Sequence, residues 1–330
     1  MRILIVCKEY IPVALYGGVE RIVWYLGREL VDMGHELTYL VKEGSSCDFA
    51  EIITLDLDRK IAEQIPKNID IVHYHYTPDH VSETSIPYLI TVHGNRNDHS
   101  EHDINSVFVS KDHAFRYGSE AFVYNGLDWK DYSDPDLPVK RNYFHFLGKA
   151  AWRIKNVQGA IDVVNSTTRE KLRVLGGSRI NLKMGFRFTL SPRVRFHGMV
   201  GGIRKEKLIN QSKGLLFPVR WHEPFGLAIP ESLYYGCPVF GTPYGALPEL
   251  VNEEVGFLSN NLGSLAEALE NSAVYSSRYC HEYARESFNS RKMAESYLRL
   301  YERILSGETL NEKPPVLKEK QTERFLEWVK

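Results

Sequence analysis

The sequence predicts two α/β domains, each a Rossmann-like doubly wound parallel sheet. Short apolar, β-branched runs alternate with stretches of helical period along most of the chain, which favours parallel strands covered by helices. The alternation lapses near residues 133–142 and then restarts. With 330 residues, 43% of them hydrophobic, the chain is long enough for two buried cores.

The first domain is expected over residues 1–140. It begins with the strand Ile3–Val6 and a helix over Val19–Met33, whose apolar residues recur at three- and four-residue steps until Gly34 supplies a stop. Four more apolar runs predict strands of the same sheet: Leu37–Val41, Ile71–His73, Tyr88–Val92 and Ser106–Ser110.

Residues 133–142 contain two prolines among clustered charges, which is typical of an exposed linker, and the domain boundary is placed there. The second domain, 141–305, ends in a strongly helical stretch from Ser277 to Leu305. Five apolar runs predict the strands of its sheet: Tyr143–Leu147, Leu172–Leu175, Val194–Phe196, Leu215–Pro218 and Val239–Gly241.

A C-terminal tail, 306–330, remains. Its last part, Val316–Lys330, has Phe325, Leu326 and Trp328 among charges. At a net charge of -1 we expect a tail or helix docked on the protein itself, with a helix on a membrane surface as the alternative that the pattern does not specifically indicate.

Composition excludes several classes of function. The 41 basic and 42 acidic residues leave no excess of positive charge for a nucleic-acid backbone. No apolar run approaches the ~20 residues that cross a bilayer. The four cysteines show no metal-type spacing, which is typical of a reducing compartment. A cytoplasmic protein is therefore expected.

Two segments contain candidate phosphate contacts. Gly17 and Gly18 precede the first helix, where backbone N–H groups can approach an anion, although the same pair equally suits a tight turn. Lys149, Arg153 and Lys155 follow the first strand of the second domain. Such cations could neutralise a departing diphosphate, and they could also belong to a solvated loop.

The most informative segment runs from Val219 to Val239. A helix is expected to start near Phe225 and to end at Gly236, with Glu223 just before it and Glu231 two turns into it. The amides of Phe225, Gly226 and Leu227 would lie at the helix N-terminus. A carboxylate can accept hydrogen bonds from the paired hydroxyls of a sugar. Alternatively, Glu223 caps the helix and Glu231 is solvated.

These residues resemble the E-x7-E signature of the retaining glycosyltransferases of the GT-B fold, group 1 (family 4), and the resemblance extends over nearly the whole chain. It implies two Rossmann-like domains facing a central cleft. The other matching segments are Tyr235–Val239, Gly245–Val251, the glycine loop Gly17–Glu20, the acceptor-side Thr91–Gly94, the turn Asn125–Asp128 and the pair Lys149 and Lys155.

The resemblance implies a role for each matched residue. Glu231 would bind the nucleotide ribose and Glu223 the transferred sugar, aided by the amides of Phe225, Gly226 and Leu227. Lys149 and Lys155 would hold the diphosphate, which Gly17 and Gly18 would approach from the other domain. His93 would lie near the reacting sugar. The family usually has arginine at position 149, so the lysine loses the bidentate fork and Arg153 could share its contact.

The resemblance thus implies a retaining, metal-independent transferase without cofactors, which moves a sugar from a nucleotide-diphosphate sugar to a hydroxyl of a saccharide, lipid or small molecule. The polar loop after His93 is the candidate acceptor side, with Tyr16, Arg96, Asn97 and His99. A histidine metal cluster at residues 73, 75, 80 and 93 is disfavoured because no carboxylate shell accompanies it. An epimerase or phosphorylase of the same fold, or a non-catalytic binder of sugar nucleotides, is the alternative.

Overall fold

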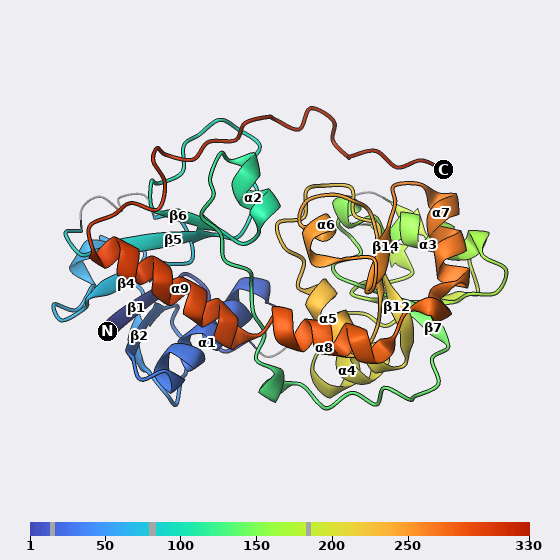
Figure 1. Ribbon diagram of the computed structural model, residues 1–330, viewed down its shortest axis with the longest axis horizontal. Helices are drawn as coiled ribbons and strands as arrows, with labels where there is room; N and C mark the ends of the chain where they lie inside the picture. The colour runs from blue at the N-terminus through green and yellow to red at the C-terminus, as the bar shows by residue number, and fades with distance from the viewer. Residues whose placement is uncertain (14–16, 79–83, 183–185) are drawn as a thin grey trace. The chain divides into compact units, whose positions relative to one another are not determined.

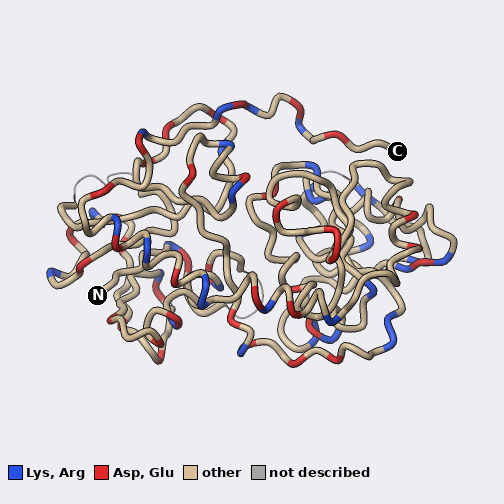
Figure 2. The backbone as a smooth tube through the Cα atoms, in the orientation of Figure 1, with Lys and Arg blue, Asp and Glu red and all other residues tan. Residues whose placement is uncertain are grey.

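The computed structural model describes residues 1–13, 17–78, 84–182 and 186–330 (Figure 1). The described chain divides into two compact units. The first unit contains Met1–Asp128 and Phe288–Gln321, and the second contains Trp129–Ser287 and Thr322–Lys330. The chain therefore passes from one unit to the other after Asp128, Ser287 and Gln321. Charges of both signs are interspersed along both units (Figure 2).

The first unit contains a six-stranded, fully parallel sheet. Its strands are β1 (Arg2–Cys7), β2 (Glu36–Val41), β3 (Glu51–Thr54), β4 (Ile71–Tyr74), β5 (Tyr88–Val92) and β6 (Ser106–Phe108). Their order is β3-β2-β1-β4-β5-β6, so the chain winds outward in both directions from β1. β3 is the strand that the sequence reading lacked; it is a short edge strand with no fully buried residue.

Helices α1 (Gly18–Asp32) and α9 (Ser290–Leu305) pack against each other in this unit (Figure 1). Leu4 and Val6 of β1 belong to an apolar cluster that includes Leu55 and the partly buried Ile65 from the connecting loops. Because β1 is buried on both faces, its sequence is a continuous apolar run rather than an alternating one. The unit also contains a 3-10 turn at Ile61–Glu63 and the short helix α2 (Lys111–Arg116).

The second unit contains another six-stranded parallel sheet, in the order β11-β8-β7-β12-β13-β14. Its strands are β7 (Tyr143–Leu147), β8 (Leu172–Leu175), β11 (Val194–Phe196), β12 (Ser212–Phe217), β13 (Val239–Gly241) and β14 (Gly256–Leu258). A separate antiparallel hairpin pairs β9 (Ile180–Asn181) with β10 (Arg187–Phe188). The helices are α3 (Val157–Ser166), α4 (Gly202–Asn210), α5 (Ala228–Tyr234), α6 (Leu247–Leu250), α7 (Leu262–Glu270) and α8 (Ser277–Ser287), with 3-10 turns at Trp129–Asp131, Arg153–Lys155 and Ser272–Val274.

Alternation along β7 assigns helices to opposite faces of this sheet. Phe144 and Phe146 belong to the apolar core formed with α3 and α7. His145 points to the other face, where its Nδ1 lies 2.8 Å from Ser212 Oγ and its Nε2 lies 2.9 Å from the Ser232 hydroxyl on α5. Helix α5 in turn packs on α8.

The helical stretch expected over Ser277–Leu305 is two helices in two different units. It breaks at Asn289, whose side chain caps α9 by accepting the Lys292 N–H. Ser290 donates to Glu29 of α1 over 2.7 Å, and Tyr297 of α9 is fully buried. Residues 288–305, expected in the second domain, thus complete the core of the first unit.

The break between units also differs from the expected position 140, because it follows Asp128. Residues 133–142 lie along the second unit. The Arg141 guanidinium donates to the carbonyls of Ser212 and Tyr235, and the Ser133 hydroxyl donates to Glu206.

The tail after residue 305 is extended and contains no helix. In the first unit the Val316 and Lys318 amides donate to the Tyr117 and Arg116 carbonyls, and Leu317 is buried between them. In the second unit the Leu326 amide donates to the Arg220 carbonyl. Across the described ranges, no helix has both the length and the apolar character needed to cross a bilayer.

Candidate functional site

Glu223 lies in the loop that connects β12 to α5, and its carboxylate is buried. Lys155 Nζ lies 2.5 Å from Glu223 Oε2, and Trp221 Nε1 donates to the same oxygen over 2.8 Å. The side chains of Lys155 and Glu223 are 13% and 7% exposed. A buried carboxylate needs such partners, because desolvation otherwise outweighs the attraction. The lysine of the loop after β7 is thereby held against the loop after β12.

A glycine fixes the backbone at Glu223. Gly245 has a φ of +63°, and a Cβ there would lie only 2.2 Å from the Glu223 amide nitrogen. Its neighbour Ala246 donates its N–H to the Glu223 carbonyl over 2.9 Å. Residue 245 must therefore be glycine for two loops to meet at this carboxylate.

Glu231, eight residues further on, lies in α5 and is 2% exposed. Its Oε1 accepts hydrogen bonds from Lys205 Nζ of α4, at 2.8 Å, and from the Tyr132 hydroxyl, at 2.9 Å. Its carboxylate is thus buried and paired rather than solvated. Glu223 does not cap α5, because the residue at the cap position is Leu227 and no side chain accepts there.

The helix expected from Phe225 begins three residues later, at Ala228. The segment before it is a turn in which Ile229 donates to the Gly226 carbonyl, and Gly226 has a φ of +86°. The amides of Phe225, Gly226 and Leu227 therefore belong to a turn between the two glutamates. The Phe225 side chain is buried.

Lys149 is exposed and follows Gly148, whose φ is +151°. Its Nζ lies 5.0 Å from the centre of the Trp152 ring. Arg153 is also exposed, and its guanidinium lies 5.0 Å from the Phe325 ring of the C-terminal tail. The three expected cations therefore have different partners: Trp152, Phe325, and Glu223 for Lys155.

In the first unit, His93 follows the end of β5. Its Nε2 lies 2.9 Å from Nδ1 of His75, which stacks on His73. His73 in turn lies within hydrogen-bonding distance of the hydroxyls of Thr91 and Tyr301. Burial lowers the pKa of His93 to about 4, so this imidazole is neutral at neutral pH. Among described residues, His, Cys, Asp and Glu form no group of three that could hold a metal ion.

Gly17 caps α1 in extended backbone, and a Cβ there would lie 2.6 Å from the Glu20 carboxylate. Gly18 begins the helix and is exposed. Of the acceptor-side candidates, Tyr16 lies outside the described residues. Asn97 exchanges hydrogen bonds with the backbone of Gln321, and His99 Nδ1 lies 2.8 Å from the Leu317 carbonyl oxygen.

Asn97 and His99 thus attach the tail, and Arg96 is held through its backbone by the Tyr117 hydroxyl. The turn Asn125–Asp128 also has a structural contact. A Cβ at Gly126 would lie 2.3 Å from the Asn289 carbonyl, so the glycine lets this turn meet the start of α9.

Sequence reasoning missed Lys205, Tyr132 and Trp221, the partners of the two glutamates. Lys205 and Tyr132 are far from Glu231 in the chain and belong to no spacing pattern. Trp221 lies two residues from Glu223, and a nearby indole donor is the one available signal.

Comparison with known proteins finds a family match over part of the chain. The family model described as "Glycosyl transferases group 1" matches residues 141–273. An uncharacterized 41.2 kDa protein in the cps region of Klebsiella pneumoniae is 28% identical over 115 residues. That match spans 33% of this chain and 32% of the relative.

Solved glycosyltransferases share the fold over nearly the whole chain. AviGT4, a glycosyltransferase involved in avilamycin A biosynthesis, is 18% identical with a TM-score of 0.75, covering 93% of this chain and 99% of that chain. Sucrose-phosphate synthase from Thermosynechococcus elongatus is 17% identical with a TM-score of 0.70 over 93% and 99%. Anabaena Alr3699/HepE, in complex with UDP-glucose, is 15% identical with a TM-score of 0.65 over 93% and 100%. The expected GT-B fold is confirmed.

Proposed function

We propose that this chain, which has the GT-B fold, is a group 1 glycosyltransferase that transfers a sugar from a nucleotide-diphosphate sugar to an acceptor hydroxyl with retention of anomeric configuration. One observation carries the proposal. Both glutamates of the E-x7-E segment are buried, and each is paired with a lysine from a different loop or helix: Glu223 with Lys155 and Glu231 with Lys205. Two buried, paired carboxylates at this spacing support the roles that the E-x7-E resemblance implies.

Glu231 is the proposed ribose ligand. Its carboxylate has two oxygens and about four lone-pair positions, of which Lys205 and Tyr132 use two on Oε1. A carboxylate can accept hydrogen bonds from the two neighbouring hydroxyls of a ribose. Lys205 supplies a positive partner, and a hydrogen bond to an ionised acceptor is stronger than a neutral one.

Glu223 is proposed to bind the hydroxyls of the transferred sugar, and Lys155 the diphosphate. A lysine ammonium has three N–H donors, and one of them is directed at Glu223. The other two can meet phosphate oxygens. Lys149 and the amides of Phe225, Gly226 and Leu227 would further stabilise the negative charge that grows on the leaving diphosphate.

In the first unit we propose His93 as the residue near the reacting sugar and Gly17 and Gly18 as diphosphate contacts. Since the imidazole of His93 is neutral, it would not repel a sugar that gains positive charge in the transition state. Arg96 and Tyr16 remain proposed for the acceptor side, whereas Asn97 and His99 would act there only by positioning the tail. The acceptor would be a hydroxyl of a saccharide, lipid or small molecule.

We also propose that neither a cofactor nor a divalent metal is needed, because the lysines can supply the positive charge that a metal would otherwise provide. A cytoplasmic location is proposed as well. The four cysteines, all within the described part of the chain, are free thiols, which supports a reducing compartment.

The test is to offer a panel of nucleotide-diphosphate sugars with candidate acceptors and to measure the released nucleoside diphosphate. We expect release that depends on one donor, together with a new glycoside. Interconversion of sugar nucleotides without release would instead indicate an epimerase. Consumption of inorganic phosphate would indicate a phosphorylase, and tight binding without any turnover would indicate a non-catalytic binder.

A further inference from the structure

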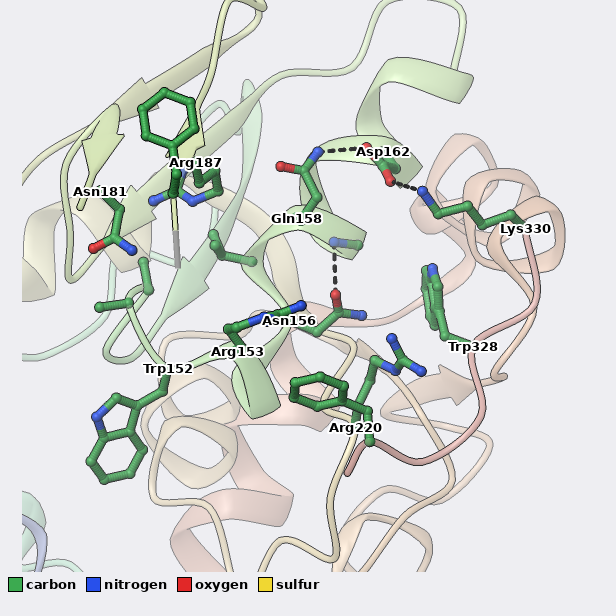
Figure 3. A pocket seen from close by; sticks show the side chains of 16 residues that line it. Trp152, Arg153, Asn156, Gln158, Asp162, Asn181, Arg187, Arg220, Trp328 and Lys330 are labelled. Carbon is green, nitrogen blue, oxygen red and sulfur yellow. Dashed lines mark hydrogen bonds and ion pairs between the residues drawn. The ribbon is translucent and has the colours of Figure 1, made fainter. Parts of the chain in front are cut away.

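A pocket of about 390 Å³ lies in the second unit, at the start of α3 (Figure 3). Its volume is within the range of about 300–1,000 Å³ that small-molecule sites occupy. Four parts of the chain line it: the segment 150–162, residues 181, 186 and 187 of the β9–β10 hairpin, Arg220 in the loop after β12, and the C-terminal tail. The tail contributes Phe325, Trp328 and Lys330.

The side chains of the two glutamates do not line this pocket. Its lining includes none of Lys149, Lys155, Glu223 and Glu231, but it includes Arg153, which the resemblance offered as a shared diphosphate contact. It is bordered by α3, which covers the Phe144 side of the sheet, whereas Glu231 belongs to α5 on the His145 side.

Three arginines line the pocket, and two of them, Arg153 and Arg220, share one aromatic ring. Arg153 and Arg220 lie 5.0 and 5.2 Å from the centre of the same Phe325 ring. In the part of the chain that the structure describes, neither forms an ion pair with a carboxylate. Burial lowers the pKa of Arg220, and the positive charge of Arg153 lowers it further. The two positive charges therefore repel each other, and an anion bound near both would relieve the repulsion.

Hydrogen-bond donors are also available. Only Nε of the Arg220 guanidinium is engaged, by the Leu326 carbonyl at 2.7 Å, and no described residue accepts from Arg153. Trp328 Nε1 is buried and has no partner among the described residues. The other cation at the tail, Lys330, is paired with Asp162 at 2.9 Å. The lining also includes Arg187, whose guanidinium donates to Thr189 Oγ1 and to the Ser178 carbonyl, so its four cations exceed its one carboxylate, Asp162, by three positive charges.

We propose that this pocket binds the phosphate monoester of a small, sugar-sized molecule. A phosphate monoester bears about -1.5 to -2 charges at neutral pH, which Arg153 and Arg220 can neutralise, and its oxygens accept the bidentate hydrogen bonds that arginine offers. The flat rings of Phe325 and Trp328 provide apolar walls for the rest of the molecule. Arg153 and Arg220 would hold the phosphate of the ligand, and the tail would contact its sugar-sized part.

The test is calorimetric titration of the full-length protein with glucose 6-phosphate, glucose and inorganic phosphate, each with saturating nucleoside diphosphate present to occupy the donor site. We expect glucose 6-phosphate to bind more tightly than inorganic phosphate, and glucose not to bind. Binding of phosphate as tight as that of the sugar phosphate would overturn the proposal. So would the loss of sugar-phosphate binding when nucleoside diphosphate is added.

Three variants locate the site. Arg153→Gln removes a side chain that holds no described backbone group, so the fold should be kept, which thermal unfolding can check. It should weaken glucose 6-phosphate binding at least about tenfold, as should Arg220→Gln. The matched control is Arg324→Gln, whose guanidinium lies 5.4 Å from the same ring but outside the pocket lining. A control that loses as much affinity as Arg153→Gln would reject the site. This result is independent of sugar transfer, because it is read from binding alone.

Discussion

Glu231→Gln separates the stabilising role of this buried carboxylate from its proposed role in binding. The substitution keeps the shape and an acceptor for the Tyr132 hydroxyl, but it removes the charge that Lys205 neutralises. Breaking a buried ion pair costs about 3–5 kcal/mol, because one charge is left uncompensated. The side chains of Lys205 and Glu231 are 11% and 3% exposed, so we expect a loss near the lower end, about 3 kcal/mol, in the free energy of unfolding.

Loss of the ribose contact should appear as a second, separate effect. A hydrogen bond to a charged group contributes about 1.5–3 kcal/mol, which corresponds to a rise of about 10- to 150-fold in the Kd of a nucleoside diphosphate. Calorimetry below the unfolding transition measures this Kd, and denaturant titration measures the stability.

Two further variants make the experiment decisive. Adding Lys205→Met to Glu231→Gln leaves no buried charge, so stability should recover while nucleotide affinity stays low. The matched control is Glu170→Gln, since Glu170 is a buried carboxylate of the same unit that pairs with Lys213 at 2.8 Å. Glu170→Gln should lower the free energy of unfolding and leave the nucleotide Kd unchanged. If the double variant regains affinity, or if Glu170→Gln weakens nucleotide binding equally, Glu231 is a structural residue only.

The remaining predictions concern the sugar, the diphosphate, metal dependence and pH. Glu223→Gln should leave the Kd of bare nucleoside diphosphate nearly unchanged and lower turnover; equal losses in both would disprove its assignment to the sugar. Lys149→Ala should raise the activation free energy of turnover by about 2–4 kcal/mol, more than it weakens nucleotide binding, and Lys149→Arg should restore the rate if charge is what matters. Activity should persist in EDTA, and its abolition followed by rescue with a stoichiometric metal would contradict metal independence. Burial lowers the pKa of His145 in the folded protein to about 3, whereas its pKa in the unfolded chain is about 6.5. Between pH 6.5 and pH 3, His145 is therefore protonated in the unfolded chain and neutral in the folded protein. The free energy of unfolding should therefore fall as pH drops from 6.5 toward 3, less so in His145→Gln; denaturant titration at pH 7.5 and 5 tests this.

Strong local patterns allowed much of the fold to be predicted. The apolar runs at β1 and β7 are buried on both faces of their sheets. In α1 the apolar residues recur with helical spacing, and the buried residues lie on one side of the helix. The sequence predicted Glu223 just before a helix and Glu231 two turns into it. The structure places Glu223 in the loop before α5 and Glu231 in the first turn of α5, because the helix begins at Ala228, and both carboxylates are buried.

The unpredicted features depend on distant contacts. Helices α8 and α9 have continuous helical periodicity, and only the packing of Tyr297 and Ser290 in the first unit reveals that they belong to different cores. The tail contains Pro314 and Pro315 before its apolar residues, and its backbone hydrogen bonds go to other segments rather than to a helix. Asn97 and His99 appeared free to bind an acceptor because their partners lie over 200 residues away.

The central claim, transfer with retention from a nucleotide-diphosphate sugar, can be tested without knowing the acceptor. Water can serve as a slow acceptor, so proton NMR can follow hydrolysis of the preferred donor and identify the sugar anomer that forms first, before mutarotation. The account predicts that the anomer formed first is the same as in the donor. It also predicts that Glu223→Gln forms this product more slowly than the unchanged protein. First formation of the opposite anomer would contradict the account.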